Sequence, residues 1–314
     1  MNNEQDALQF LGFYGIFKES IKIILTWPKI FIQITLAFIL PHSCLHLANN
    51  WITKLIFGKW ATYWLIVVVY FLLTVILSLF SVSAIVYTVA CIYSSKKITF
   101  KKVVSVVPKV WKRLMATLLC NFCILVAYIF ALLLVVAIYA FTYYKLFYKP
   151  EDGLANLVKA IRIIGYIEGI LFMIGFFYLA MIWQLANVVS VMEVNCGVKA
   201  LIKSKELIKG KMGTSLAILL VMNFGATLIY IFIKELVGYG IVERIVVGIL
   251  SLVVLTIFSL FALVAQTIFY LVCKSYHHES IDKSSLADQL DVYLLGEYVP
   301  LKSGGAIQLE EIHV

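Results

Sequence analysis

The strongest constraint on this chain is a series of apolar stretches, each long enough to cross a lipid bilayer. A transmembrane helix needs about 20 consecutive and predominantly apolar residues. Six stretches satisfy that requirement, at residues 28–48, 60–93, 114–144, 161–192, 214–233 and 242–272. Several exceed what a helix perpendicular to the membrane needs, so we expect tilted helices or helices that continue beyond the membrane.

The composition excludes the main classes of soluble protein. Hydrophobic residues make up 63% of the 314 residues and charged residues 14%, whereas ordinary globular domains have about 45–50% and about 25%. A single soluble core cannot hide so much apolar surface from water. We therefore predict a polytopic membrane protein, which excludes a soluble enzyme, a nucleic-acid-binding domain and a disordered regulator.

The distribution of basic residues predicts the orientation of the chain. If the six stretches alternate in direction, 18 of the 26 Lys and Arg residues fall on the side of the two termini and 8 on the opposite side. Cytosolic loops of membrane proteins carry an excess of Lys and Arg, so both termini are predicted to be cytosolic. This rule explains the positive net charge without a nucleic-acid partner. The first nine residues contain Glu4 and Asp6 but no basic residue, so no cleaved leader is expected.

A basic and partly apolar segment precedes each pair of spans, at residues 8–27, 98–114 and 197–211. The pattern predicts an all-α membrane protein with six transmembrane helices and three cytosolic amphipathic or interfacial helices, in which a helix–span–span unit is used three times. The transmembrane domain is predicted to occupy residues 1–274. Residues 275–314 are polar and are predicted to form a largely disordered cytosolic tail that offers contacts to partner proteins.

The middle basic segment divides into two faces when its residues are placed at about 100° intervals around a helix. The apolar face contains Phe100, Val103, Val104, Val107, Val110, Trp111 and Leu114. Such a helix is predicted to lie in the headgroup plane with its basic residues against anionic lipid, and Pro108 is expected to bend it. The candidate residues for contact with lipid or a partner protein are Lys101, Lys102, Lys109, Trp111, Lys112 and Arg113.

Few ionisable or strongly polar side chains fall inside the predicted spans. Glu168 is the only acid well inside a span, and acids in that position are costly and often functional. Arg162 lies near the same end of the span, so a structural pairing is favoured over a transport or proton role. Together with Asn187 and Asn223, Glu168 forms a candidate intramembrane polar site. Interhelical hydrogen bonds can explain the uncharged amides, which are Asn121, Gln184, Asn187, Asn223 and Gln266.

Histidine and cysteine residues offer weaker signals. His42 and His46 are four residues apart, with Cys44 between them, which resembles one histidine box of the membrane hydroxylases and desaturases. Those enzymes need several boxes and this chain has five histidines in all. Ordinary interfacial histidines are therefore favoured over an outer zinc or copper site, and no metal or cofactor is predicted. The cysteines at predicted cytosolic membrane boundaries are candidates for S-palmitoylation, namely Cys91, Cys196 and Cys273.

Three runs carry a resemblance to a known family, at residues 93–114, 182–191 and 295–301. The two specific runs within them are Val-Pro-Lys-Val-Trp-Lys-Arg at residues 107–113 and Gly-Glu-Tyr-Val-Pro-Leu at residues 296–301. Over residues 8–303 the chain resembles a family of uncharacterised plant multi-pass transmembrane proteins, whose members are sometimes labelled polyadenylate-binding-protein-binding. The helix–span–span plan is distantly similar to the membrane domain of bacterial glycerophosphodiester phosphodiesterases. Their catalytic barrel has no counterpart here, so the resemblance implies no activity.

The chain contains no phosphate-binding loop, no nucleophile motif and no paired carboxylates on a common face. We therefore predict a non-enzymatic protein of the endomembrane system (endoplasmic reticulum) or the plasma membrane, whose basic cytosolic surface contacts anionic lipid or a partner protein. The alternative is a transporter or channel for a small solute or a lipid. A polar cavity lined by Glu168, Asn187 and Asn223 would favour that alternative, and a solid apolar interior would argue against it.

Overall fold

The computed structural model describes residues 9–55, 60–94, 98–148, 155–193, 195–236 and 241–277. Within these ranges the regular secondary structure is helical. The elements are α2 (Phe13–Thr26), α3 (Pro28–Ile34), the π-helical turn η1 (Thr35–Ile39), α4 (Leu40–Leu55), α5 (Trp60–Tyr93), α6 (Phe100–Tyr148), α7 (Ala155–Met192), α8 (Val198–Ile208), α9 (Met212–Leu236) and α10 (Ile241–Tyr276). Most of the predicted polar tail, residues 278–314, lies outside the described residues.

Six helices in the described part of the chain are long and apolar enough to cross a membrane. They cover Pro28–Leu47, Trp64–Tyr93, Phe100–Tyr144, Lys159–Met192, Met212–Ile229 and Ile245–Tyr276. This confirms the predicted all-helical membrane protein with six spans. The first span is composite, because α3, η1 and α4 follow one another directly. It is separated from α2 by Trp27, whose backbone is not helical, and by Pro28, which suits the first position of a helix.

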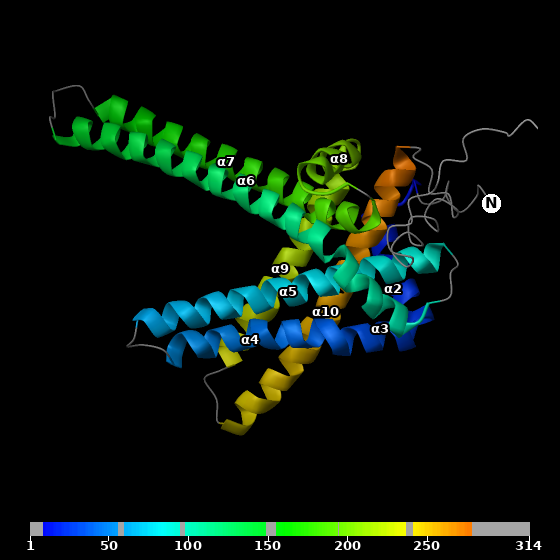
Figure 1. Cartoon of the computed structure of the whole chain (residues 1–314). Helices are drawn as coiled ribbons and strands as arrows, with labels where there is room; N and C mark the ends of the chain where they lie inside the picture. The colour runs from blue at the N-terminus through cyan, green and yellow to red at the C-terminus, as the bar shows by residue number, and fades with distance from the viewer. Residues whose placement is uncertain are drawn as a thin grey trace, which may run out of the picture.

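The spans pair into three hairpins that meet at one end of the molecule and diverge at the other (Figure 1). The hairpins are formed by α3–η1–α4 with α5, by α6 with α7, and by α9 with α10. The short helices α2 and α8 lie at the end where the hairpins meet. We call this end the base, made of α2, α8, the first turns of α6 and the adjoining ends of the other spans.

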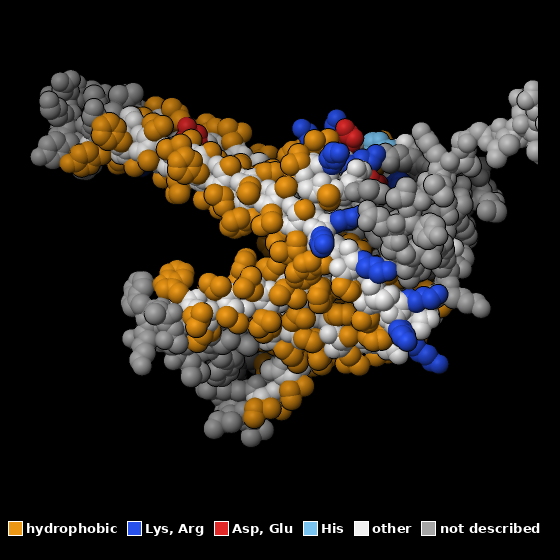
Figure 2. Space-filling model, in the orientation of Figure 1, with side chains coloured by type: hydrophobic (Ala, Val, Ile, Leu, Met, Phe, Trp, Pro, Cys, Tyr) orange, Lys and Arg blue, Asp and Glu red, His pale blue; other side chains and the backbone are white. Residues whose placement is uncertain are grey.

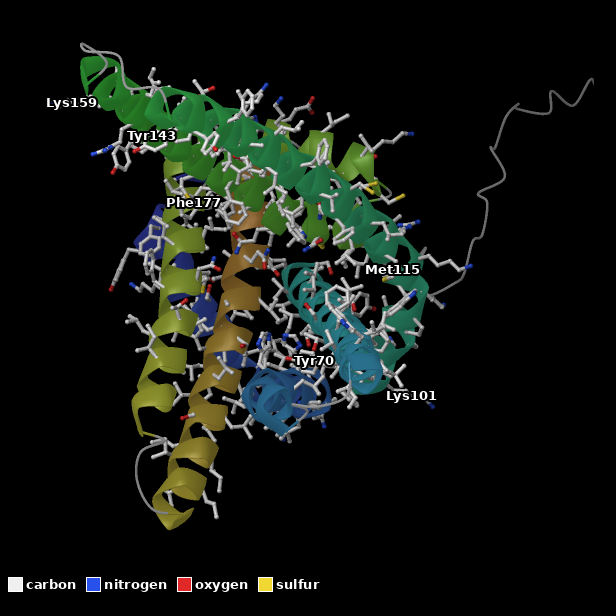
Figure 3. All side chains as sticks on the ribbon, turned by 90° about the vertical axis from the view of Figure 1, so that its left-hand side faces the viewer. Tyr70, Lys101, Met115, Tyr143, Lys159 and Phe177 are labelled. Atoms are coloured by element: carbon white, nitrogen blue, oxygen red, sulfur yellow. The ribbon has the colours of Figure 1, made fainter. Side chains whose placement is uncertain are left out.

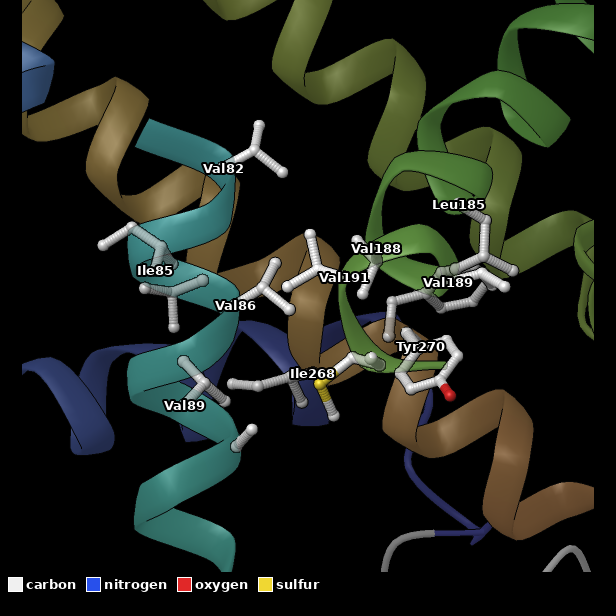
Figure 4. Packing of buried hydrophobic residues seen from close by; sticks show 14 of the residues in the cluster. Val82, Ile85, Val86, Val89, Leu185, Val188, Val189, Val191, Ile268 and Tyr270 are labelled. Carbon is white, nitrogen blue, oxygen red and sulfur yellow. The ribbon is translucent and has the colours of Figure 1, made fainter. Parts of the chain in front are cut away.

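The hydrophobic core lies in the base. Figure 4 shows Val82 and Val86 of α5 directed toward α7, with Ile268 and Tyr270 of α10 close by. Ile85, Val189 and Ile268 are fully buried there. The outer halves of α6 and α7, in contrast, expose almost all of their large apolar side chains, including Phe130 and Leu133. A water-soluble protein does not expose so large a continuous apolar surface, so this surface faces lipid and the protein is integral to the membrane.

The segment at residues 98–114 differs from its prediction. It forms the first turns of the continuous helix α6 rather than a separate surface helix, and α6 runs through Pro108 without interruption. Five of its apolar side chains are at most 3% exposed, namely Val103, Val106, Val107, Val110 and Leu114, whereas Val104 is 39% exposed. The predicted position in the headgroup plane is therefore wrong for this apolar face. Helical periodicity shows that a helix has an apolar face, but it does not show whether lipid or protein covers that face.

The other two basic segments form separate short helices. In α2 the buried residues are Ile16, Ser20 and Ile23, and in α8 the corresponding positions are Ala200, Ser204 and Leu207. Each buried serine hydroxyl donates a 2.7 Å hydrogen bond to the carbonyl oxygen one turn earlier. The same spacing relates the buried residues Val103, Val107 and Val110 of α6. The three basic segments therefore bury residues with the same i, i+4, i+7 spacing in the base.

Candidate functional site

The polar face of the first turns of α6 forms a basic surface at the base. Lys101, Lys102, Lys109 and Lys112 are exposed, and Arg113 is half-buried. Figure 2 shows Lys and Arg side chains gathered near this end, while the visible hairpin surfaces are apolar. Figure 3 shows Lys101 at the edge of the molecule. We call these five residues the basic face.

Trp111, which was also predicted to contact lipid or a partner, packs against a neighbouring helix. Its ring packs edge-on against Phe80 of α5, with ring centroids 5.2 Å apart and an interplanar angle of 68°. The side chain is half-buried. Trp111 therefore helps to hold α6 against α5, which fixes the direction in which the lysines of the basic face point.

Helix α8 is attached to its neighbours at both ends. At its start, the N–H of Gly197 donates a 2.9 Å hydrogen bond to Oγ1 of Thr117 on α6, and Thr117 Oγ1 lies 2.7 Å from Oγ of Ser190 on α7. At its end, Nε2 of His277 donates to the carbonyl oxygens of Leu207 at 3.2 Å and Lys209 at 3.0 Å. These contacts fix α8 beside the α6–α7 hairpin.

A groove of about 860 Å³ lies between α6 and α7 on one side and α8 and α9 on the other. Figure 3 shows Phe177, one of its lining residues, where the α6–α7 hairpin crosses α9. The wall formed by α8 is one helical face, with the spacing expected for residues that share a side. That face consists of Val198, Leu201, Ile202 and Lys205.

The five amide side chains named in the sequence analysis all line this groove. They are Asn121 of α6, Gln184 and Asn187 of α7, Asn223 of α9 and Gln266 of α10. The structure therefore brings Asn187 and Asn223 into one site, as the sequence-based candidate site supposed. Most of the remaining lining is apolar and includes Phe176, Phe177, Trp183 and Phe224.

Interhelical hydrogen bonding explains these amides only in part. Gln266 Nε2 on α10 donates to the backbone carbonyl oxygen of Gln184 on α7, which is an interhelical bond of the predicted kind. Asn223 Nδ2 instead donates to Leu219 O of its own helix at 2.8 Å. Among the described residues, Nδ2 of Asn121 and Oδ1 of Asn187 are buried and have no hydrogen-bond partner. A buried polar atom without a partner costs roughly 1–3 kcal/mol, so these two atoms require an explanation.

The two unpartnered atoms belong to residues at the same depth. Thr117 and Ser190 are in contact across the antiparallel α6–α7 pair. Asn121 lies one turn beyond Thr117, and Asn187 lies one turn before Ser190, so both are one turn farther from the base. Asn121 and Asn187 therefore line the groove at its end nearest the base, and their unpartnered donor and acceptor atoms are covered by the surrounding protein.

Glu168 does not belong to the groove. It is half-buried on the outer part of α7, eight residues beyond the last lining residue of that helix, Phe176. The predicted pairing with Arg162 is also absent from the ion pairs of the described residues. Six residues correspond to about 240° around an α-helix, so the two side chains point from different faces.

Close packing of α6 against α7 uses two glycines. A Cβ on Gly165 would lie 2.9 Å from the ring of Tyr139, and a Cβ on Gly175 would lie 2.6 Å from Oη of Tyr128. Gly169 has open space where its Cβ would be. The tyrosines of α6 therefore occupy the space above glycines of α7, which brings the two backbones together in the lipid-exposed hairpin.

The histidine and cysteine candidates occupy different environments. The rings of His42 and His46 are 5.0 Å apart and nearly perpendicular, at 84°. In the described part of the chain, no three His, Cys, Asp or Glu side chains are grouped as a metal site would require. The thiols of Cys91 and Cys273 are buried, whereas Cys196 is exposed in the turn before α8. Burial disfavours acylation of the first two and leaves Cys196 accessible.

Sequence reasoning missed a buried polar cluster at the base. Oε1 of Glu193, at the end of α7, accepts a 2.8 Å hydrogen bond from the Tyr270 hydroxyl and lies 3.6 Å from Nζ of Lys274. Oε2 accepts a 3.0 Å hydrogen bond from Nδ2 of Asn195. The sequence signals were Tyr270 and Lys274, one turn apart on α10, and an acid directly after a long apolar span. Nothing in the sequence places these two elements together.

The fold and the groove define an integral membrane protein built from helical hairpins on a shared base. The chain belongs to the family described as Domain of unknown function (DUF8558), whose model matches residues 1–59 and 52–312. No curated protein and no solved structure matches the chain significantly. The family match agrees with the predicted membership of an uncharacterised family, and it assigns no activity, so the function is argued from the surface and the groove.

Proposed function

We propose that this protein is a non-enzymatic multi-pass membrane protein whose basic face contacts anionic lipid or a partner protein, with a role in membrane organisation or trafficking. The supporting observation is the division of the first turns of α6 into two faces. Its valines are buried in the base, while Lys101, Lys102, Lys109 and Lys112 are exposed. Because the valines are packed in the base, the lysine side chains of α6 project together from one side of the protein.

Electrostatics favours an anionic membrane surface as the contact. A Lys or Arg close to an anionic leaflet contributes about 1 kcal/mol, and the effect decays within about a Debye length. The proposed orientation puts the base and both termini on the cytosolic side, where anionic lipids are concentrated. The endoplasmic reticulum and the plasma membrane are the proposed locations. A protein partner would bind the same face or the predicted cytosolic tail.

Lipid selectivity in reconstituted bilayers tests this proposal. The protein is placed in vesicles that contain spin-labelled phosphatidylserine or phosphatidylcholine, and electron paramagnetic resonance measures the fraction of each lipid immobilised at the protein. Replacing Lys101, Lys102, Lys109 and Lys112 with Gln should reduce the preference for phosphatidylserine at least about five-fold at low salt. Replacing the same residues with Arg keeps the charge and should preserve the preference.

Equal preferences in the Gln and Arg variants would contradict contact between the basic face and anionic lipid. Retained lipid preference with loss of a cytosolic binding protein in the Gln variant would identify a protein as the contact. Proximity labelling from the cytosolic tail, compared between the two variants, detects that second outcome.

A carrier for a small solute or a lipid is the second candidate function, and the amide-lined groove favours it. The groove places five amide side chains within the spans, as the binding sites of many carriers place polar groups. Glu168 is outside the groove, so this candidate does not rely on it. Proteoliposomes with a fluorescent lipid in both leaflets test lipid movement, because dithionite destroys the outer label at once and the inner label only if the protein moves lipid across.

The finer resemblances are also proposals. We propose that the family includes the uncharacterised plant transmembrane proteins that share the two sequence runs, and that it is distantly related to the membrane domain of bacterial glycerophosphodiester phosphodiesterases. The repeated buried face in α2, α6 and α8 supports a shared helix–span–span plan. A structure of that bacterial membrane domain with unrelated helix order would contradict the second relationship.

A further inference from the structure

We infer that the groove between α6, α7, α8 and α9 binds one anionic membrane phospholipid whose headgroup carries hydroxyl groups. This inference goes beyond the basic face and does not rest on it. Lys101, Lys102, Lys109 and Lys112 are absent from the groove lining, and Lys205, the cation that lines it, is on α8.

Along α7 the groove changes from polar near the base to apolar farther along the span, as an amphiphile does. Asn187 lies nearer the base than Phe176, and Lys205 of α8 and Asn121 of α6 also lie near the base. On α9 the polar residues Asn223 and Thr227 flank the apolar Phe224. The eleven residues from Phe176 to Asn187 correspond to roughly 16 Å of helix, which is comparable with a phospholipid's headgroup and glycerol together with the start of its chains. A lipid of the leaflet at the base would thus place its headgroup by α8 and its chains toward the membrane centre.

Three groups at the polar end specify the chemistry of the headgroup. The ammonium of Lys205 requires an anion, and the unpartnered Nδ2 of Asn121 requires a hydrogen-bond acceptor. A phosphodiester in the groove satisfies both when the covered Asn121 amide rotates toward it. The unpartnered Oδ1 of Asn187 requires a donor, which a hydroxyl of an inositol or glycerol headgroup supplies. Phosphatidylcholine lacks that donor, and its quaternary ammonium would lie close to Lys205.

Asn121 shows that this end of the groove is a formed site rather than an open surface. Its side chain is on the groove wall, the residue is only 4% exposed, and its Nδ2 has no partner among the described residues. The apolar rim is open in contrast, since Phe224 is 62% exposed. A lipid can therefore enter sideways from the bilayer, and its chains can leave the groove along the same rim. The volume of about 860 Å³ is within the range of about 300–1,000 Å³ that is usual for ligand sites.

Native mass spectrometry of the full-length protein tests the inference. The purified protein is exposed to phosphatidylinositol and phosphatidylcholine with identical acyl chains, and the ratio of the two bound lipids is measured. We expect the protein to retain phosphatidylinositol about ten-fold better than phosphatidylcholine. Lys205→Gln should lower this ratio about ten-fold, and Asn121→Leu and Asn187→Leu should lower it as well. The matched control is Lys199→Gln, which removes an exposed charge from the same helix outside the groove.

Three results would overturn the inference. They are equal retention of the two lipids by the unaltered protein, the same ratio for Lys205→Gln as for Lys199→Gln, and full displacement of the lipid by water-soluble glycerophosphoinositol, which lacks chains for the apolar half. Lys205 is exposed, so its substitution leaves the fold intact even if the asparagine variants do not fold. In the background of the Gln variant of the basic face, Lys205→Gln should still lower the ratio relative to Lys199→Gln. Failure of the proposed function and failure of the groove are therefore separate outcomes.

Discussion

The hydroxyl of Tyr270 on α10 donates a 2.8 Å hydrogen bond to Oε1 of Glu193, the residue that follows α7. Lys274 and Asn195 complete the surroundings of this carboxylate, at 3.6 Å and 3.0 Å. Removing one partner of a buried charge is costly because the remaining charge loses its compensation. The cluster therefore joins the ends of two different hairpins at the base.

Loss of the Tyr270 hydroxyl should destabilise the protein. Tyr270→Phe removes one hydrogen bond to a buried carboxylate, which should cost about 1.5–3 kcal/mol and lower the unfolding temperature in detergent. Tyr14→Phe is the control, because Tyr14 is 79% exposed. If the two variants unfold at the same temperature, the Glu193 cluster does not stabilise the base.

A side chain at Gly197 should weaken the attachment of α8. The backbone of Gly197 has φ +61°, a conformation that other residues adopt at a cost of about 1–3 kcal/mol, and a Cβ there would lie 3.3 Å from Sγ of Cys120. Gly197→Ala should therefore lower stability and also reduce lipid binding in the groove. Gly12→Ala is the control, since Gly12 has φ −85° and open space around it. Equal stability of the two variants in thermal unfolding would rule out strain at this turn.

Two glycines of α7 should respond in opposite directions to alanine. Gly175→Ala places a methyl group 2.6 Å from Oη of Tyr128 and disturbs the hydrogen bond that this hydroxyl donates to Phe172 O, so it should destabilise the α6–α7 hairpin. Gly169→Ala meets open space and should be neutral or stabilise the helix by up to about 1 kcal/mol. The unfolding temperatures of the two variants in lipid nanodiscs test this prediction. A loss of stability in Gly169→Ala alone would refute the assigned packing.

Cysteine labelling should distinguish the three acylation candidates and report the orientation. In sealed cells, a membrane-impermeant maleimide should fail to label Cys196, and after selective permeabilisation of the plasma membrane it should label Cys196 strongly. Cys91 and Cys273 are 2% and 0% exposed and should react only after unfolding. Single-cysteine variants separate the signals. Labelling of Cys196 from outside sealed cells would reverse the proposed topology, and acyl exchange that is unchanged in Cys196→Ser would exclude its palmitoylation.

The six spans could be predicted because length and apolarity alone decide whether a helix can cross a membrane. The fusion of residues 98–114 with the third span was missed, although the sequence contains a relevant signal. Gly197 and Gly210 flank α8 with positive φ angles, and Pro28 separates α2 from the first span. No glycine or proline lies between Pro108 and the start of the third predicted span, so nothing ends the helix there.

The sequence indicated which polar residues lie within the spans, but not that they converge on one groove. Asn187 and Asn223 were recognised as polar residues within spans, but their convergence depends on the packing of α7 against α9, which periodicity does not determine. Glu168 was grouped with them because of its polarity, although the structure puts it on the outer part of the hairpin. The bond between Tyr270 and Glu193 joins residues 77 positions apart, and no local pattern encodes such a contact.

The divergence of the hairpins gives surrounding lipid a structural role. Beyond the base, the outer parts of α6 and α7 contact each other but little else in the described chain, so acyl chains must fill the wedge beside them. Bilayer thickness and lateral pressure would then help to set how far the hairpins open. In thin or loosely packed membranes the hairpins would extend from the same base at a different angle. The shape of the protein would then depend on the surrounding membrane as well as on its own packing.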